Sequence, residues 1–396
     1  MSIMHLERAY LIQTLAAVLH ECEPPQPPEN LDWEKLYKLS VRHSVSNMAH
    51  CGITGLSQEQ QPPSDIMKAF QIDYKKSIAR EAIQHITLED ILQVFEEQQI
   101  ACVPLKGILV KYLYPRPDMR TMADLDILFQ DEQTEQVKKL LTDMGYSVED
   151  EGAYHDVYFK KPIINLQMHR WLMPKSSPYS NYFMNVWDRA ILQTGSQFMF
   201  RLSPEDFYIH LMVHLTNHYA KAGTGIRSIM DIWLYREHYG NQLDWHYIEA
   251  ELRKIHLLTF TKNICGLGEV WFANAESNAL YDEMADYIFA SGVYGNQKNL
   301  QLSSMNAVST QTDANGTVKL KYYLKLFFPG LQHMTILYPF LGALPFLMPI
   351  CWLLRGVKSL RNRRRNTLAI INIVHSASAD DISQIRNHHT RVGLPF

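Results

Sequence analysis

The amino-acid sequence predicts an α+β fold, in which a small mixed β-sheet core is flanked by helical N- and C-terminal regions. Short apolar runs typical of strands gather between residues 100 and 171. Apolar residues recur at helical spacing before and after that stretch, as in residues 6–20. The chain has 396 residues, 46% of them hydrophobic, which is enough to form a sizeable core.

Composition excludes several classes of protein. The net charge of −3 argues against a general attraction to nucleic acid. Five cysteines are scattered without a C-x-x-C pair, which favours reduced thiols over a disulfide framework. Glu7 and Arg8 precede only a short apolar run, so the start of the chain is unlike a signal peptide. We therefore expect a cytoplasmic protein, with membrane association as the alternative.

The pattern of elements suggests four regions. We expect a helical region at 1–78, a core at 79–195, a helical region over the core's cleft at 196–330, and an apolar, proline-broken segment with a basic tail at 331–396. A long helix is predicted from 64 to 98, with a break near Ser77. Residues 154–160 and 163–171 suggest paired strands, and the polar stretch 297–316 suggests a loop.

The chemistry is concentrated in residues 103–129. Asp124 and Asp126 lie two apart at the start of an apolar strand, so they should share one face. Two neighbouring carboxylates repel each other, and a divalent cation such as Mg²⁺ or Mn²⁺ removes that penalty. Lys106 and Gly107 follow an earlier strand, where a phosphate can approach the backbone, and Arg120 can neutralise phosphate charge. The alternative is a solvated acidic pair at the end of a loop.

These motifs resemble a known family. L-K-G at 105–107, Y-P at 114–115 and R-T-M-A-D-L-D-I-L at 120–128 are similar to the uncharacterised nucleotidyltransferases of the polymerase-β superfamily. The resemblance implies Mg²⁺-dependent transfer of a nucleoside monophosphate from an NTP to the hydroxyl of an unidentified acceptor. It implies metal ligation by Asp124 and Asp126, and nucleotide binding by Lys106, Gly107 and Arg120, with support of the turn as the other role for Arg120.

The sequence departs from the family at residue 167. The family carries an acid two residues before a histidine on this strand, whereas this chain has Gln167 and His169. A glutamine can offer a carbonyl oxygen but neither charge nor a base. We assign Gln167 and His169 to the acceptor side of the catalytic set, with His169 as the substitute base. A nucleotide-binding protein that has lost transfer activity, or a structural or membrane-adjacent interaction protein, are the alternatives.

A third motif begins at Ser203, where S-P-E-D predicts the start of a helix. His210, His214 and His218 follow at intervals of four, on one stripe of that helix. No H-E-x-x-H motif or cysteine cluster accompanies them, so zinc is disfavoured. In the resembling family this helix lies over the cleft, which implies that His214 and His218 line the nucleotide site or support it.

Residues 334–354 contain no charged side chain, although prolines at 339, 345 and 349 argue against one straight span. Six of the eleven residues from 355 to 365 are Lys or Arg. We expect the apolar segment to pack on the folded domain. Peripheral membrane contact through residues 334–365 is the alternative.

Overall fold

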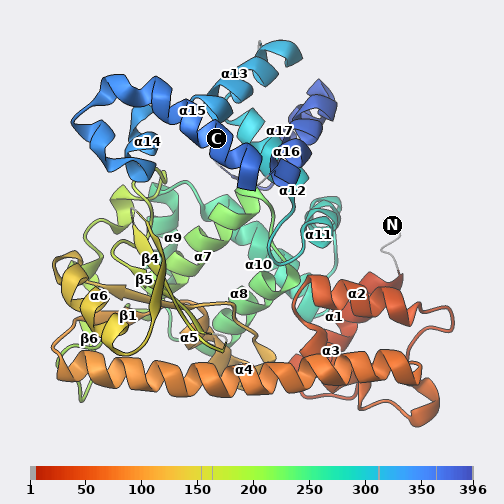
Figure 1. Ribbon diagram of the computed structural model, residues 1–396. Coiled ribbons are helices and arrows are strands. Elements are labelled where there is room, and N and C mark those ends of the chain that lie inside the picture. The colour runs from red at the N-terminus through yellow and green to blue at the C-terminus, as the bar shows by residue number, and fades with distance from the viewer. Residues whose placement is uncertain (1–5, 153, 163, 311–312, 363, 395–396) are drawn as a thin grey trace. The chain divides into compact units, whose positions relative to one another are not determined.

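The computed structural model describes residues 6–152, 154–162, 164–310, 313–362 and 364–394 (Figure 1). It divides the chain into two units. The first comprises residues 1–215 and 225–293, and the second comprises 216–224 and 294–396. The first unit therefore contains the predicted N-terminal region and core together with most of the third predicted region.

The first unit opens with four helices. They are α1 (Leu6–Leu19), α2 (Trp33–Arg42), α3 (Ser46–Ile53) and α4 (Ser64–Glu97). The break predicted near Ser77 is wrong, because α4 runs unbroken through it. The Ser77 hydroxyl donates to the carbonyl of Tyr74 at 2.8 Å, so this buried polar group is satisfied within the helix.

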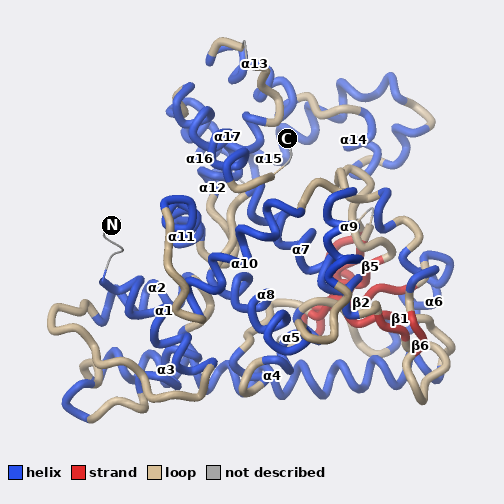
Figure 2. Tube along the Cα trace, turned by 180° about the vertical axis from the view of Figure 1, so that it is seen from behind, coloured by secondary structure: helices blue, strands red, loops and turns tan. Residues whose placement is uncertain are grey.

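The sheet confirms the predicted α+β class. Its five strands are β1 (Cys102–Pro104), β2 (Leu125–Phe129), β3 (Ser147–Glu151), β4 (His155–Lys160) and β5 (Ile164–His169). Their spatial order is β1-β2-β5-β4-β3, in which β2 and β5 are parallel and the other pairs antiparallel. Figure 2 shows these strands in red. Strand β3 was not predicted, because its S-V-E-D-E run is polar and almost wholly exposed.

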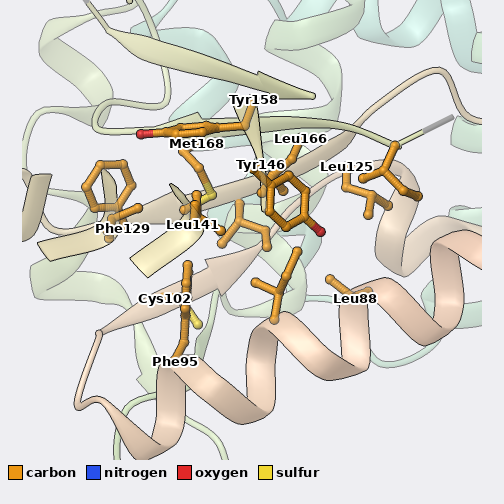
Figure 3. Packing of buried hydrophobic residues seen from close by; sticks show 14 of the residues in the cluster. Leu88, Phe95, Cys102, Leu125, Phe129, Leu141, Tyr146, Tyr158, Leu166 and Met168 are labelled. Atoms are coloured by element: carbon orange, nitrogen blue, oxygen red, sulfur yellow. The ribbon is translucent and has the colours of Figure 1, made fainter. Parts of the chain in front are cut away.

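One face of the sheet packs on helices (Figure 3). Leu125, Ile127 and Met168 join a buried cluster with Leu88 of α4 and with Leu141 of α6 (Thr134–Asp143). Because alternate residues of a strand point to opposite faces, burial of Leu125 and Ile127 directs Asp126 to the other face. The core therefore fixes the direction in which the acidic residue points.

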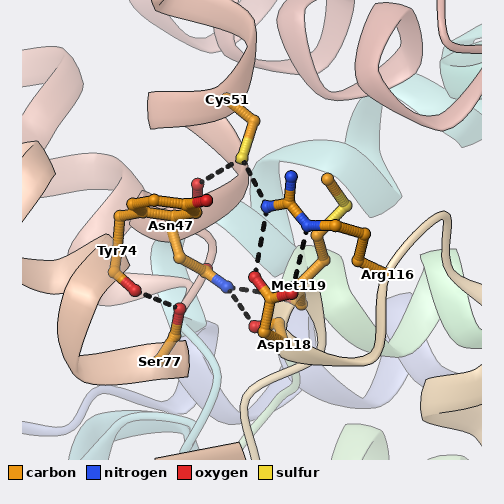
Figure 4. A network of polar contacts seen from close by, with 7 residues as sticks. All are labelled: Asn47, Cys51, Tyr74, Ser77, Arg116, Asp118 and Met119. Carbon is orange, nitrogen blue, oxygen red and sulfur yellow. Dashed lines mark hydrogen bonds and ion pairs between the residues drawn. The ribbon is translucent and has the colours of Figure 1, made fainter. Parts of the chain in front are cut away.

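A polar network fastens the loop between α5 (Gly107–Val110) and β2 (Figure 4). Asn47 of α3 donates from Nδ2 to the carbonyls of Asp118 and Met119 at 2.8 and 3.0 Å. Arg116 bonds the Asp118 carboxylate at 3.1 and 3.2 Å and the Cys51 sulfur at 3.4 Å. These contacts hold the short turn η3 (Pro117–Met119), which leads directly to Arg120.

The remaining elements of the first unit are mainly helical. They are the small hairpin of β6 (Ile191–Leu192) and β7 (Phe200–Arg201), then α7 (Pro204–Lys221), α8 (Ile226–Tyr239), α9 (Trp245–Lys254), α10 (Leu258–Phe272) and α11 (Ala279–Ser291). The predicted start of α7 is confirmed, since the Ser203 hydroxyl accepts from the Asp206 amide at 3.0 Å. Residues 216–224, which include the end of α7, belong to the second unit.

The rest of the second unit is helical in its described part. It contains α12 (Gln297–Asn306), α13 (Asn315–Phe327), α14 (Leu331–Leu337), α15 (Met348–Asn362), α16 (Arg364–Ser376) and α17 (Ala379–Arg391). The loop predicted at 297–316 is wrong over α12. The Asn296 side chain caps that helix by accepting from the Asn299 amide at 2.7 Å, and Leu302 and Met305 are buried.

The apolar segment 334–354 folds into several short pieces. Met334, Leu341 and Cys351 form a small buried cluster, and the described side chains packed against it come from this same segment. The packing of the segment on the folded domain therefore stays a prediction. Among the described residues, no helix combines the length and the apolarity that crossing a bilayer requires.

Candidate functional site

The turn between β1 and α5 positions Lys106 and Gly107. Lys106 has a φ of +48°, a conformation that few L-residues adopt, and it immediately precedes α5. A β-carbon on Gly107 would lie 2.2 Å from Nη1 of Arg120 and 2.6 Å from the sulfur of Met122. Gly107 is therefore required for the close approach of Arg120, a role that the sequence analysis did not identify.

Asp126 lies at the centre of the site. Its Oδ1 accepts hydrogen bonds from Lys106 Nζ at 2.9 Å and from His169 Nε2 at 2.7 Å. Burial alone would raise the pKa of Asp126, but the Lys106 charge and the His169 hydrogen bond outweigh it and hold that pKa well below its ordinary value. Asp126 is therefore ionised at neutral pH although only 7% of its surface is exposed.

Gln167 lies beside the acidic pair. Asp126 on β2 is in register with Gln167 on the parallel strand β5. The Gln167 amide donates from Nε2 to Oδ2 of Asp124 at 2.6 Å. Burial, together with the nearby Asp126 charge, raises the pKa of Asp124 to about 6. The two aspartates therefore differ in pKa. The Asp126 carboxylate is held ionised beside the Lys106 charge, whereas the pKa of Asp124 lies close to neutral pH.

His169 belongs to the same cluster. Burial lowers its pKa, so it is neutral at pH 7 and donates its Nε2 hydrogen to Asp126. Its Nδ1 is buried and has no hydrogen-bond partner among the described residues. The imidazole therefore has one nitrogen anchored on the acid, and the other is an acceptor.

Arg120 forms an ion pair with an acidic residue outside this cluster. Its Nε and Nη2 atoms bond the two carboxylate oxygens of Asp231 on α8, at 2.9 and 2.7 Å. Tyr114 also donates to Asp231, at 2.7 Å. All three side chains are buried, so this cluster joins the loop before β2 to α8. Of the two roles considered for Arg120, these contacts support the structural one.

Tyr154, His155 and His210 had no predicted role in the site. His155 lies opposite His169 in the β4–β5 pairing, and their rings stack with centroids 5.1 Å apart. The ring centroid of the neighbouring Tyr154 lies 5.9 Å from that of His169. The strands predicted at 154–160 and 163–171 could have indicated this cluster of rings, because their pairing brings the rings together.

His210 of α7 is the third of these residues. It is fully buried, and neither ring nitrogen has a hydrogen-bond partner among the described residues. Burial, with the charge of Lys106 adding to it, lowers its pKa to about 3. A neutral imidazole close to Lys106 and Asp126 therefore contributes polar atoms but no charge. The stripe of histidines identified in the sequence contained this residue, although the nucleotide role was assigned to the other two.

His214 and His218 are placed differently by the structure. His214 is half-buried, and its ring centroid lies 6.5 Å from that of His210. His218 is exposed and belongs to the second unit. Their predicted contact with a nucleotide stays a prediction.

Two carboxylates form the acidic part of the site. Within the described residues, no group of three or more His, Cys, Asp and Glu side chains is arranged to hold a metal ion. Mg²⁺ is commonly held by one or two protein carboxylates, with water and nucleotide phosphates completing its six ligands. Asp124 and Asp126 fit that pattern, and Oδ2 of Asp126 has no hydrogen-bonding side chain within the described part of the chain.

Comparison with models of protein families gives a match. The model of a family described as "Uncharacterised nucleotidyltransferase" matches residues 29–273, which is more than half of the chain and includes every strand of the sheet. No curated protein and no solved structure matches the chain.

Proposed function

Since this chain belongs to the family of uncharacterised nucleotidyltransferases, we propose that it transfers a nucleoside monophosphate from an NTP to a hydroxyl group of its acceptor, with Mg²⁺ or Mn²⁺. One observation supports this most strongly. Lys106, Asp124, Asp126, Gln167 and His169 converge through hydrogen bonds of 2.6–2.9 Å at one face of the sheet.

In this proposal Asp124 and Asp126 hold the cation. Its charge would favour the ionised form of Asp124, whose pKa of about 6 reflects burial beside a second carboxylate. When bound, Mg²⁺ supplies charge neutralisation to the triphosphate. Lys106 contacts the Asp126 carboxylate at 2.9 Å, and its ammonium group would be available to a phosphate oxygen if that carboxylate held the cation.

The acceptor side consists of Gln167 and His169. An acceptor hydroxyl oxygen forms a bond to the α-phosphorus, the bond from that phosphorus to the bridging oxygen breaks, and pyrophosphate leaves. The hydroxyl proton passes to Nδ1 of His169, which lacks a partner among the described residues and is the available acceptor on this neutral ring. The hydrogen bond from Nε2 to Asp126 then stabilises the imidazolium.

A second function is favoured by the Gln167 contact. The amide donates to Asp124, so residue 167 gives that acid a hydrogen bond where the resembling family has a third carboxylate. This arrangement suits a protein that binds an NTP without transferring its nucleotidyl group.

Two measurements test these proposals. Binding is followed as the rise in melting temperature with a non-hydrolysable NTP and Mg²⁺ or Mn²⁺. Transfer is followed as pyrophosphate release from each of the four NTPs in the presence of candidate acceptor hydroxyls. A melting shift with pyrophosphate release supports transfer, whereas a shift without release for any acceptor supports the binding function.

The binding site itself is tested with Asp124→Asn combined with Asp126→Asn, which should abolish the ligand-induced shift. The matched control is Asp65→Asn with Asp90→Asn, two exposed aspartates on α4. An equal shift in wild type and in the Asp124/Asp126 variant would exclude this site.

A further inference from the structure

The second unit contains a long stretch without acidic residues. From Ala314 to Ala379 there are 66 residues, nine Lys or Arg, and no Asp or Glu. With a net charge of −3 for the whole chain, the remaining residues carry −12. This sixth of the chain therefore carries a net charge of +9 because it lacks acidic residues, although it holds only nine of the 38 Lys and Arg residues.

The same stretch exposes apolar side chains. Of the 24 large hydrophobic residues that are exposed in the described part of the chain, 14 lie within it. Scattered exposed apolar residues are normal on a folded protein, but a contiguous set is typical of a binding surface.

Helix α15 arranges these residues in a stripe. Ile350, Leu353, Leu354 and Val357 follow the i, i+3, i+4, i+7 spacing and are between 54% and 72% exposed. This is the spacing by which a helix normally packs on its own core, yet among the described side chains of α15 the buried one is Cys351. Helix α15 therefore directs its apolar face outward.

Basic residues continue that outward face. Arg361 lies eleven residues after Ile350, about three helical turns along the same stripe, and Lys358 flanks it. Both are exposed. An apolar helical face bordered by Lys and Arg is the pattern of a helix that lies in the interface of a membrane.

Helix α13 repeats this arrangement. Leu320, Leu324 and Phe327 are between 43% and 59% exposed at i, i+4 and i+7. Trp352 donates from its indole to the Pro329 carbonyl at 3.0 Å, and Arg355 donates to the Leu326 carbonyl at 2.9 Å. The end of α13 is thus fastened to α15.

The turns between these helices add exposed aromatic residues. Phe340 lies in η7 (Pro339–Gly342) and Phe346 in η8 (Pro345–Leu347), and they are 48% and 73% exposed. Large aromatic side chains at the tips of proline turns can enter the boundary between headgroups and acyl chains.

We propose that the surface formed by α13, the turns η7 and η8, and α15 binds peripherally to a lipid bilayer that contains anionic headgroups. The apolar stripes supply the buried area, and the acid-free basic stretch supplies attraction to the anionic leaflet. A second copy of the chain is a less suitable occupant, because two copies of this surface would bring like charges together. The inference concerns a different surface from the nucleotide site, so it stands whether or not transfer is found.

Sedimentation with vesicles tests the inference on the full chain. We expect binding to phosphatidylcholine vesicles containing 30% phosphatidylglycerol, weaker binding to pure phosphatidylcholine, and a loss of affinity as salt is raised. Lys358→Glu with Arg361→Glu should weaken binding roughly 25-fold or more, at about fivefold for each basic residue removed.

The apolar stripe is tested with Leu353→Asp and Leu354→Asp, which should weaken binding at least about tenfold. The control is Ile72→Asp with Ile86→Asp, which adds the same charge at exposed positions of α4 and should leave binding unchanged. If Leu353→Asp and Leu354→Asp disturb folding, the Lys358/Arg361 variant still tests the inference, because it keeps the apolar stripe. Absence of wild-type binding, equal loss in the α4 control, or a stable dimer that does not bind vesicles would overturn the inference.

Discussion

Gln167 and Asp124 are joined by a hydrogen bond of 2.6 Å, from the amide Nε2 to the carboxylate Oδ2. The two residues are 43 positions apart in sequence and meet because β2 and β5 are parallel neighbours. The amide gives Asp124 a hydrogen-bond donor without adding charge. Gln167 therefore stabilises the Asp124 carboxylate by donating a hydrogen bond to it.

Gln167→Glu should make stability dependent on metal. Without a divalent cation, the variant loses the donor and adds a carboxylate beside Asp124, which should lower the free energy of unfolding by about 1–3 kcal/mol. With saturating Mg²⁺ the added acid becomes a ligand, so most of that loss should be recovered. Urea unfolding in EDTA and in Mg²⁺ measures both values.

The control for this variant is Gln61→Glu, the same change at a half-buried glutamine outside the sheet, whose Nε2 donates to the Leu56 carbonyl at 3.0 Å. It should cost stability equally with and without Mg²⁺. If Gln167→Glu behaves in the same way, residue 167 does not contact the metal.

Asp124→Asn should change the pH dependence of stability. The folded-state pKa of Asp124 is about 6, above its ordinary value of 3.8, so the folded state holds this proton more tightly than the unfolded state. The stability linked to that proton is present below about pH 4 and is lost as the pH rises to about 6. Asparagine has no charge to bury, so the variant should be more stable than wild type above pH 6, by about 1–2 kcal/mol after allowance for partial exposure.

Urea unfolding from pH 4 to pH 8 checks this expectation. The advantage of the variant should disappear towards pH 4 and should shrink when Mg²⁺ is present. An advantage that is constant with pH would assign the effect to something other than the Asp124 charge.

Asp126→Asn should lower the free energy of unfolding at neutral pH, which is the opposite of the effect expected for Asp124→Asn. The Asp126 carboxylate is held ionised by Lys106 and His169, so its stabilising effect is present above about pH 4 and is lost as the pH falls through its depressed folded-state pKa. At pH 7 the variant leaves Lys106, whose side chain is only 15% exposed, without its anion. The expected cost is about 3 kcal/mol or more.

Lys106→Met, introduced into the Asp126→Asn background, should restore part of that loss, because it removes the buried lysine charge that has lost its anion. Denaturation of the two single variants and the double variant gives the coupling free energy. Additive losses would show that the 2.9 Å contact does not stabilise the folded state.

The sequence allowed the chemical face of the sheet to be predicted, because strand alternation is local. Asp124 and Asp126 were expected to point the same way, and their flanking apolar residues were expected to be buried. The partners that lie far apart in sequence could not be deduced in this way. Asp231 meets Arg120 across 111 positions, and only the folded arrangement of α8 against the loop brings them together.

Two other features show where local patterns failed. The polar stretch after Asn296 has the composition of a loop, but its capping residue and a few buried apolar side chains form α12. Gly107 was interpreted as a position for phosphate approach, whereas the contact that excludes a β-carbon there is with Arg120. Composition and motif spacing contain no information about such tertiary contacts.

The Arg120–Asp231 pair yields the last prediction. Asp231→Asn removes the anion from a buried guanidinium that it binds through two hydrogen bonds, and it should lower the free energy of unfolding by about 3–5 kcal/mol. Tyr114→Phe removes one neutral donor to the same carboxylate and should cost only about 1 kcal/mol.

Because Gly107 packs directly on Arg120, release of Arg120 should also loosen the turn at Lys106 and Gly107. Hydrogen exchange at residues 105–110 should therefore become faster in Asp231→Asn and stay nearly unchanged in Tyr114→Phe. Equal and small effects of the two substitutions would mean that the ion pair does not hold this turn in place.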